Sequence, residues 1–185
     1  MLDAAGNVAA TDLYARSTGL APRFVVRAIR PDDETKLGAF FRGLSPASRH
    51  RRFLAVINEL PAELLAHFAR PDGHTEVALV ATTGAGGNES IVGEARFVGA
   101  GGCDCAEFAL VVSDGAQRRG LGQRLLRSLI QRALDNDIAC LYGDVLPDNH
   151  LMLGLVRKYG FSEGRNPADP RLLRVRKTLN PSPAG

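Results

Sequence analysis

The loop at residues 117–122 has the sequence Gln-Arg-Arg-Gly-Leu-Gly and lies between an apolar run and an amphipathic one. Several backbone N–H groups can converge where such a loop enters a helix, and the positive end of the helix dipole attracts anions there. The two arginines add charge-assisted donors, and the two glycines allow a phosphate to approach the backbone closely. The loop therefore predicts a pyrophosphate-binding site.

Spacing discriminates between the types of phosphate loop. A triphosphate loop of the Walker type ends in Gly-Lys-Ser/Thr, whereas Gly122 is followed by Gln123 and Arg124. A dinucleotide loop needs a third glycine where this chain has Leu125. The remaining pattern, Gln/Arg-x-x-Gly-x-Gly/Ala after a strand, resembles the acyl-CoA pyrophosphate loop of the GNAT acyltransferase superfamily. An ordinary strand-to-helix turn is the alternative interpretation of these six residues.

Length, composition and charge limit the class of protein. The chain has 185 residues, of which 45% are hydrophobic and 23% charged, enough for one domain with a sizeable core. The formal net charge of +3 is modest, and no basic run interleaved with aromatic residues indicates nucleic-acid binding. No apolar run reaches the roughly 18 residues of a membrane span, and no signal-peptide pattern begins the chain. We expect a soluble cytoplasmic protein that binds neither nucleic acid nor membranes.

Cysteine and histidine positions predict neither a metal site nor a disulfide framework. The three cysteines, Cys103, Cys105 and Cys140, cannot all pair, and no His/Cys pair stands at ligand spacing near them. The four histidines are scattered along the chain. We expect reduced thiols, with Cys140 as a small buried hydrophobic residue on a strand, and no bound metal.

Hydrophobic periodicity and turn residues predict one α/β domain over residues 23–180, with a flexible lead-in at 1–22 and a tail at 181–185. Asp32 and Ser45 are candidate caps for two early helices. The strand–helix–strand unit across residues 107–146 requires a parallel strand pair, with the phosphate loop at a carboxyl end where such sheets bind ligands. Strands are expected at residues 24–30, 75–83, 90–98, 107–112, 138–146, 161–163 and 172–179, and helices at 32–44, from 46 onward, at 62–69, 121–133 and 149–158.

Further motifs extend the resemblance over about residues 24–179. Residues 149–152 (Asn-His-Leu-Met) and 157–161 (Arg-Lys-Tyr-Gly-Phe) resemble the closing helix and "GF" signature of GNAT enzymes. Within the superfamily the chain is most similar to the Pat-type protein-lysine acetyltransferases. Many of those relatives carry a synthetase-like or nucleotide-sensing region, whereas only about twenty residues precede the first predicted strand here. The Pat-type likeness rests on Arg30-Pro-Asp-Asp33, Leu44-Ser45 to Arg52-Phe53, Ala106-Glu-Phe-Ala109, Leu146-Pro-Asp-Asn149 and Asn166-Pro-Ala-Asp-Pro-Arg171.

The resemblance implies the GNAT fold, a mixed and mostly antiparallel sheet flanked by helices, in which one parallel strand pair forms the CoA slot. It also implies a bacterial-type, acetyl-CoA-dependent N-acetyltransferase whose acceptor is a protein lysine side chain. A small amine or amino acid as acceptor, and a non-catalytic acyl-CoA-binding regulatory module, are the alternatives. The sequence does not reveal acyl-chain preference, regulation or the choice between monomer and homodimer.

Acyl transfer to an amine requires a base, because the ammonium form of lysine (pKa about 10.4) has no lone pair. The resemblance assigns this role to Glu107. On a regular strand Glu107, Ala109 and Val111 share one face, so small apolar neighbours would desolvate the carboxylate and raise its pKa. A solvated glutamate paired with an arginine is the alternative. Glu94 is the second candidate base, although Glu94 and Arg96 more simply suggest an exposed ion pair.

The proton donor to the departing CoA thiolate is not evident. Many GNAT enzymes have a tyrosine four positions before the glycine of "GF", where this chain has Val156. Tyr159 lies on another side of the same helix, and we expect it to pack or to lie at the surface. Water or Tyr142 could donate the proton, and the Pat-type resemblance implies a mechanism that uses a glutamate alone.

The resemblance also implies which residues bind CoA. Backbone N–H groups at residues 110–112 would face the thioester carbonyl and stabilise its developing charge. Asn149 would contact the CoA arm, cap the following helix, or do both. Arg49, Arg51 and Arg52 are interpreted as a solvated helix face rather than a substrate clamp. The expected CoA-binding residues are Leu110, Val111, Val112, Gln117, Arg118, Arg119, Gly120, Leu121, Gly122, Gln123 and Asn149.

Overall fold

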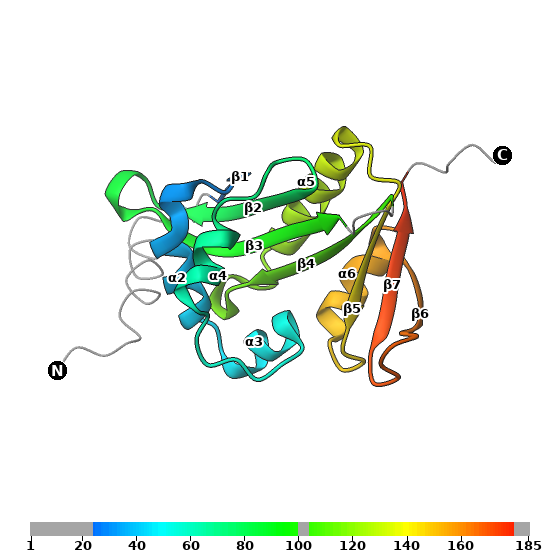
Figure 1. Cartoon of the computed structure of the whole chain (residues 1–185). Coiled ribbons are helices and arrows are strands. Elements are labelled where there is room, and N and C mark those ends of the chain that lie inside the picture. Colours follow the sequence, from blue (N-terminus) through cyan, green and yellow to red (C-terminus); the bar gives the residue numbers. More distant parts are fainter. Residues whose placement is uncertain (1–23, 100–103, 180–185) are drawn as a thin grey trace.

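The computed structural model describes residues 24–99 and 104–179, in which seven strands form one mixed sheet (Figure 1). The order across the sheet is β1-β2-β3-β4-β5-β7-β6. Neighbouring strands are antiparallel except β4 and β5, which are parallel. This confirms the predicted fold class. The strands are β1 (Val25–Ala28), β2 (Glu76–Thr83), β3 (Ser90–Gly99), β4 (Cys105–Val112), β5 (Cys140–Val145), β6 (Ser162–Arg165) and β7 (Leu173–Thr178).

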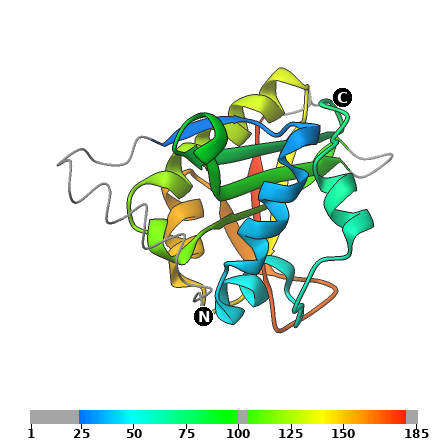
Figure 2. The same cartoon turned by 90° about the vertical axis from the view of Figure 1, so that its left-hand side faces the viewer.

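Helices cover both faces of the sheet (Figures 1 and 2). Three early helices lie on one face: α2 (Glu34–Arg42), α3 (Pro46–Phe53) and α4 (Ala62–Phe68). The other face is covered by α5 (Leu121–Asp135) and α6 (His150–Lys158). Short 3₁₀ turns occur at η1 (Pro31–Asp33), η2 (Gly86–Asn88) and η3 (Asp114–Ala116), and η3 leads from β4 toward α5.

Each face of the sheet has its own apolar core, because side chains alternate between the faces along each strand. On β4, Leu110 and Val112 belong to the cluster under α5 and α6, whereas Val111 packs with the cluster under α2. The predicted alternation along this strand is therefore confirmed. The apolar face of α5 is fully buried against the sheet through Leu121, Leu125, Leu126, Leu129 and Ala133.

Local sequence signals predicted most of these elements correctly, but one predicted capping residue is wrong. The β2–β3 hairpin is present, and the Ser45 side chain caps α3 by accepting a hydrogen bond from the Ser48 N–H, as predicted. Asp32 does not cap α2. The chain instead makes a 3₁₀ turn, in which the buried Asp33 carboxylate accepts from the Arg30 N–H at 2.9 Å and pairs with Arg27. The predicted lead-in at 1–22, the tail at 181–185 and Cys103 lie outside the described residues.

Candidate active site

The parallel strands β4 and β5 separate after three residue pairs. The paired residues are Cys105 with Cys140, Ala106 with Leu141, and Glu107 with Tyr142. Just beyond the last pair, Gly143 lies against β4 so closely that a Cβ there would stand 2.9 Å from the Phe108 carbonyl oxygen. The two strands diverge from this point, so their following backbone groups face a gap rather than each other.

A cleft of about 200 Å³ occupies the gap between the strands. One wall is β4, the opposite wall is β5, and the ends of α3 and α6 close it above and below the sheet. Three of the expected site residues, Glu107, Leu110 and Asn149, line it. The full lining is Arg51, Arg52, Phe53, Leu54, Glu107, Phe108, Ala109, Leu110, Gly143, Asp144, Val145, Asn149 and Met152.

Glu107 stands on the last paired rung, where the cleft begins. The residue is exposed, and no hydrogen bond or ion pair engages its carboxylate within residues 24–99 and 104–179. The predicted desolvation by apolar neighbours is therefore wrong, because β5 leaves β4 here and opens this face to solvent. The alternative, a solvated glutamate paired with an arginine, is confirmed in its first part only: Glu107 is solvated and adds to Asp144 in raising the pKa of Arg174, but it makes no ion pair in the part of the chain that the structure describes. Glu107 thus combines an accessible carboxylate with a position at the mouth of the slot.

Glu94, the second candidate base, is fully buried and held between two arginines. Its carboxylate accepts from Arg96 Nε at 2.5 Å and from Arg52 Nε at 3.2 Å. Burial alone would raise the pKa of Glu94, but the two guanidinium groups outweigh it and hold the pKa below its ordinary value. The expected exposed Glu94–Arg96 pair is wrong, since α3 and α4 cover this part of β3. Glu94 has no access to a substrate.

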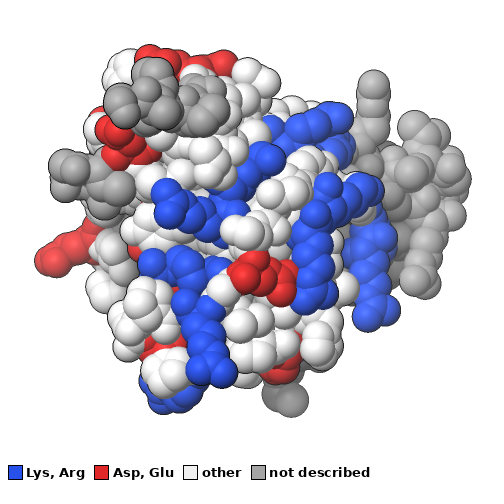
Figure 3. Space-filling model, turned by 90° about the vertical axis from the view of Figure 1, so that its right-hand side faces the viewer, with Lys and Arg blue, Asp and Glu red and all other residues white. Residues whose placement is uncertain are grey.

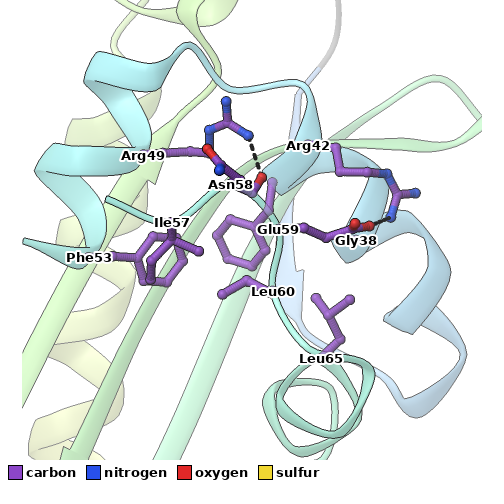
Figure 4. A pocket seen from close by; sticks show the side chains of 10 residues that line it. Gly38, Arg42, Arg49, Phe53, Ile57, Asn58, Glu59, Leu60 and Leu65 are labelled. Atoms are coloured by element: carbon purple, nitrogen blue, oxygen red, sulfur yellow. Dashed lines mark hydrogen bonds and ion pairs between the residues drawn. The ribbon is translucent and has the colours of Figure 1, made fainter. Parts of the chain in front are cut away.

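The arginines of α3 have different environments, so the expected solvated helix face is only partly present. Arg51 is exposed and lies 3.8 Å from Asp148, whereas the Arg52 side chain is 7% exposed because it reaches inward to Glu94. Arg49 Nη1 donates to the Asn58 carbonyl at 2.7 Å. That contact borders a second hollow under the end of α3, which holds only about 10 Å³ between its lining side chains (Figure 4). A space of this size admits no substrate.

The other end of α3 is joined to the loop that carries the phosphate cradle. Asp114 accepts hydrogen bonds from the Ser45 N–H at 3.0 Å, the Ser45 hydroxyl at 2.9 Å and the Ser48 hydroxyl at 2.7 Å. Burial would raise the pKa of Asp114, but these donors together lower it. Gln117 Nε2 extends the contact by donating to the Val112 carbonyl at 3.1 Å. Residues near 45 and 114, far apart in sequence, thus form one clasp beside the cleft.

The predicted cradle has the backbone shape of an anion site. Arg118 and Gly120 both have left-handed backbone conformations, with φ of 60° and 77°, on either side of Arg119. Alternating backbone conformations of this kind turn successive N–H groups toward a common point. No side chain caps α5, and a Cβ at Gly120 would meet nothing within 4 Å. The first N–H groups of α5 therefore lack both an intrahelical partner and a side-chain cap among the described residues, a geometry that fits a pyrophosphate.

The remaining expected CoA-binding residues take structural positions around this loop. Leu121 is buried in the core, so only its backbone could contact a ligand, and Gly122 packs near Leu155. The Gln123 side chain accepts from Lys158 Nζ at 3.0 Å, and its carbonyl accepts from the Tyr159 hydroxyl at 3.1 Å. The expectation that Tyr159 packs rather than reacts is supported by that bond, which ties α6 to α5.

Asn149 is the N-cap of α6, where its Oδ1 accepts from the Met152 N–H at 3.3 Å. The capping interpretation is thus confirmed, and the amide nitrogen remains to donate into the cleft that Asn149 lines. Val156 is completely buried and cannot exchange protons with a substrate. Tyr142, the alternative proton donor, lies opposite Glu107 on β5.

Sequence reasoning missed a disulfide between Cys105 and Cys140. The expectation of reduced thiols is corrected, because the two residues are partners on the first rung of the parallel β4–β5 pair and their Cα atoms lie 4.5 Å apart. An odd number of cysteines gave no signal of this pairing, which depends on strand register. No group of three or more metal-ligating side chains occurs in the part of the chain that the structure describes. None of the described helices is both long and apolar enough to cross a membrane.

Comparison with known proteins decides the family. The sequence matches the acetyltransferase (GNAT) family over residues 45–161. An acetyltransferase from Pseudomonas aeruginosa is 32% identical over 161 residues, which cover 85% of this chain and 85% of that relative. The chain belongs to the GNAT acetyltransferase family. It is therefore an acyltransferase, and acetyl-CoA is the acyl donor that the family uses.

Solved structures agree with this assignment. The GNAT domain of S. lividans PAT is 26% identical and superposes with a TM-score of 0.75, covering 85% of this chain and 97% of that domain. The yncA protein of Salmonella typhimurium, solved with its cofactor acetyl-CoA, is 18% identical with a TM-score of 0.69 and covers 88% and 98% of the two chains. The second likeness shows the fold only. The predicted superfamily is thus confirmed.

Proposed function

We propose that this GNAT enzyme transfers an acetyl group from acetyl-CoA to the side-chain amine of a protein lysine, with Glu107 as the general base. The observation that carries the proposal is the position of Glu107. Of the two carboxylates in the described cleft lining, Asp144 forms an ion pair with Arg174, whereas Glu107 forms no ion pair and stands where β4 and β5 separate. The Pat-type motifs and the 26% identity with the GNAT domain of S. lividans PAT favour a lysine as acceptor.

The cradle binds the pyrophosphate of the donor through the N–H groups of residues 118–122, with Arg118, Arg119 and Gln123 around it. Gln117 fixes the loop through its bond to the Val112 carbonyl. Backbone N–H groups alternate between the two sides of β4, so those of Leu110 and Val112 face the gap that β5 leaves and stabilise charge on the thioester oxygen. The Val111 N–H faces β3 instead, which removes Val111 from the expected donors. One such donor contributes about 2.7–4 kcal/mol in other acyl-transfer enzymes. Asn149 contacts the CoA arm with its amide nitrogen.

The chemical step needs a neutral amine, and Glu107 supplies it by accepting the ammonium proton, directly or through one water. The neutral amine then attacks the thioester without an enzyme-bound intermediate. The thiolate takes its proton from water or from Tyr142, because Val156 is buried and has no proton to give. The enzyme thus acts with one carboxylate as its general base.

Release of CoA thiol from acetyl-CoA tests the proposal. The purified protein would be given lysine-containing peptides, free amino acids and small primary amines in separate reactions. We expect thiol release with lysine peptides, above the rate of hydrolysis without acceptor. Tight CoA binding without turnover on any amine would instead indicate a regulatory module, and turnover on small amines alone would exclude a protein acceptor.

A further inference from the structure

The charged side chains that line the cleft near Glu107, on the side where the acceptor would enter, differ in the strength of their ion pairs. We call this side the acceptor side. Two of the lining charges have strong internal partners, since Arg52 binds the buried Glu94 and Asp144 binds Arg174 Nε at 2.5 Å. Arg51 differs, because its side chain is 38% exposed and its ion pair with Asp148 spans 3.8 Å. Exposed pairs of that kind contribute about 0–1 kcal/mol, so Arg51 can exchange this partner for another carboxylate.

A second exposed arginine stands on the opposite wall. Glu107, Tyr142 and Arg176 form one row across β4, β5 and β7, and side chains in such a row share a face of the sheet. Strands are spaced by about 4.8 Å, so the backbones of Glu107 and Arg176 are about 10 Å apart. Arg176 also leans back across β5, since its Nη2 lies 3.6 Å from Cys105 Sγ on β4. Its guanidinium therefore lies beside the first rung of the β4–β5 pair, on the same face of the sheet as Glu107 and two residues from it along β4.

The basic character extends beyond the cleft itself. Figure 3 shows Lys and Arg side chains spread over this side of the molecule, with acidic side chains confined to small patches. Among the exposed basic residues on α6, β6, β7 and the loop between these strands, Arg157 pairs with Glu163 and Arg171 pairs with Asp169. Lys158 and Arg165 lie toward the α6 face, and Arg176 lies on the same face of the sheet as Glu107. An isolated ammonium ion approaching such a surface is repelled, whereas an amine accompanied by carboxylates is attracted.

We propose that the acceptor lysine lies in an acidic segment of a protein, and that Arg51 and Arg176 bind carboxylates on either side of that lysine. This inference rests on the proposed transfer to lysine, and it names the class of segment that the same site selects. Arginine suits the role because its planar guanidinium can bind a carboxylate through two parallel hydrogen bonds.

The geometry favours a protein segment over a free amino acid. Arg51 belongs to α3 and lines the cleft, whereas Arg176 belongs to β7 and lies beside Cys105 at the closed end, so the two guanidinium groups stand on different sides of Glu107. One small molecule with a single carboxylate cannot pair with both while its amine reaches Glu107. A chain with acidic residues before and after the lysine can.

Three peptides that differ only beside one lysine test the inference. The lysine is flanked on both sides by glutamate, glutamine or arginine, and kcat/KM is measured by thiol release at low salt. We expect the glutamate peptide to exceed the glutamine peptide by about three- to tenfold, the value of two exposed ion pairs, and the arginine peptide to be poorest. The preference should nearly vanish in about 1 M sodium chloride, where the Debye length is about 3 Å.

Substitutions of the two arginines test whether these residues cause the preference for the glutamate peptide. In the double variant Arg51→Gln/Arg176→Gln, the ratio of kcat/KM between the glutamate and glutamine peptides should fall to about one. Arg165→Gln is the matched control, because Arg165 is an exposed arginine on β6 that pairs with Leu173 and lies on the opposite face from Arg174. This control should keep the ratio of the wild type.

Two results would overturn the inference while leaving transfer to lysine intact: equal use of the three peptides, or a preference that survives in the double variant. A different result separates the two proposals. If free amino acids react and no lysine peptide does, the lysine acceptor of the proposed function fails, and the acidic segment fails with it.

Discussion

The proposed donor side, at the cradle, and the proposed acceptor side, at the cleft, are built in different ways. The donor side is made of backbone, namely the left-handed conformations at Arg118 and Gly120 and the uncapped start of α5. The acceptor side is made of side chains from distant segments, among them Arg52 with Glu94 and Asp114 with Ser48. A backbone site follows from a short stretch of sequence, whereas a side-chain site exists only after the chain has folded.

The largest effect is expected from breaking the buried pair that supports the acceptor side. Glu94→Gln leaves Arg52 and Arg96 buried without their shared counter-charge, so the free energy of unfolding should fall by about 3–5 kcal/mol. Urea denaturation measures this change. The double variant Glu94→Gln/Arg52→Met should lose less than the two single losses added together. A single-variant loss below about 1 kcal/mol would show that the pair does not support α3.

The same pair predicts a pH dependence. Because the pKa of Glu94 is lower in the folded protein than its ordinary value of 4.5, the folded state binds fewer protons there than the unfolded state. Its contribution to stability is therefore complete above pH 4.5 and is lost as the pH falls through the lower folded value. Glu94→Gln should show a shallower loss of stability in acid than the wild type.

Reduction of the Cys105–Cys140 disulfide, at the closed end of the cleft, should have the next largest effect on stability. The bond closes a loop with a sequence separation of 35, for which chain entropy gives a stabilisation of about 3–4 kcal/mol. Dithiothreitol should therefore lower the Tm of the wild type in a thermal scan. It should leave the Tm of Cys105→Ala unchanged, and an equal response of both proteins would mean that the bond is absent in solution.

On the donor side, Gly120→Val should weaken CoA binding by about 5- to 30-fold, because a left-handed conformation costs a residue with a Cβ about 1–2 kcal/mol. Calorimetric titration with CoA measures the change. Gly73→Val is the matched control, since Gly73 also has a positive φ (83°) and open space around it but lies far from the cradle in sequence. Equal losses of CoA affinity in both variants would show that the backbone at Gly120 has no specific role.

The smallest effect on stability and kinetics is expected at the contact between Asp114 and the start of α3, which joins the donor loop to the acceptor side. Asp114→Asn keeps the shape of the clasp but removes the charge that accepts from Ser45 and Ser48, and should cost about 1 kcal/mol of stability. Because α3 carries Arg51, the KM for the acceptor should rise a few-fold while the KM for acetyl-CoA changes less. Equal changes in both KM values would show that the clasp serves the donor loop instead.

Features formed by local backbone could be predicted from the sequence, whereas features formed by side chains from distant segments could not. The loop at residues 117–122 that leads into α5 and the cap at Ser45 were predicted because each depends on neighbours within a few positions. Glu94 and Glu107 are both glutamates on strands, and their environments were predicted the wrong way round. Glu94 is buried because Arg52, 42 positions away, supplies a charge beside it, and Glu107 is exposed because β5 departs. Neither fact has a local sequence signal, and nor does the disulfide.

The most direct test of the separation between donor and acceptor sides is Glu107→Gln, measured for CoA affinity by calorimetry and for turnover by thiol release. Glu107→Gln keeps the size of the side chain and removes only the base. We expect CoA affinity within about twofold of the wild type and a kcat lower by about 10²–10⁴-fold, the usual contribution of a general base. An unchanged kcat, or a loss of CoA affinity equal to the loss of turnover, would contradict this account.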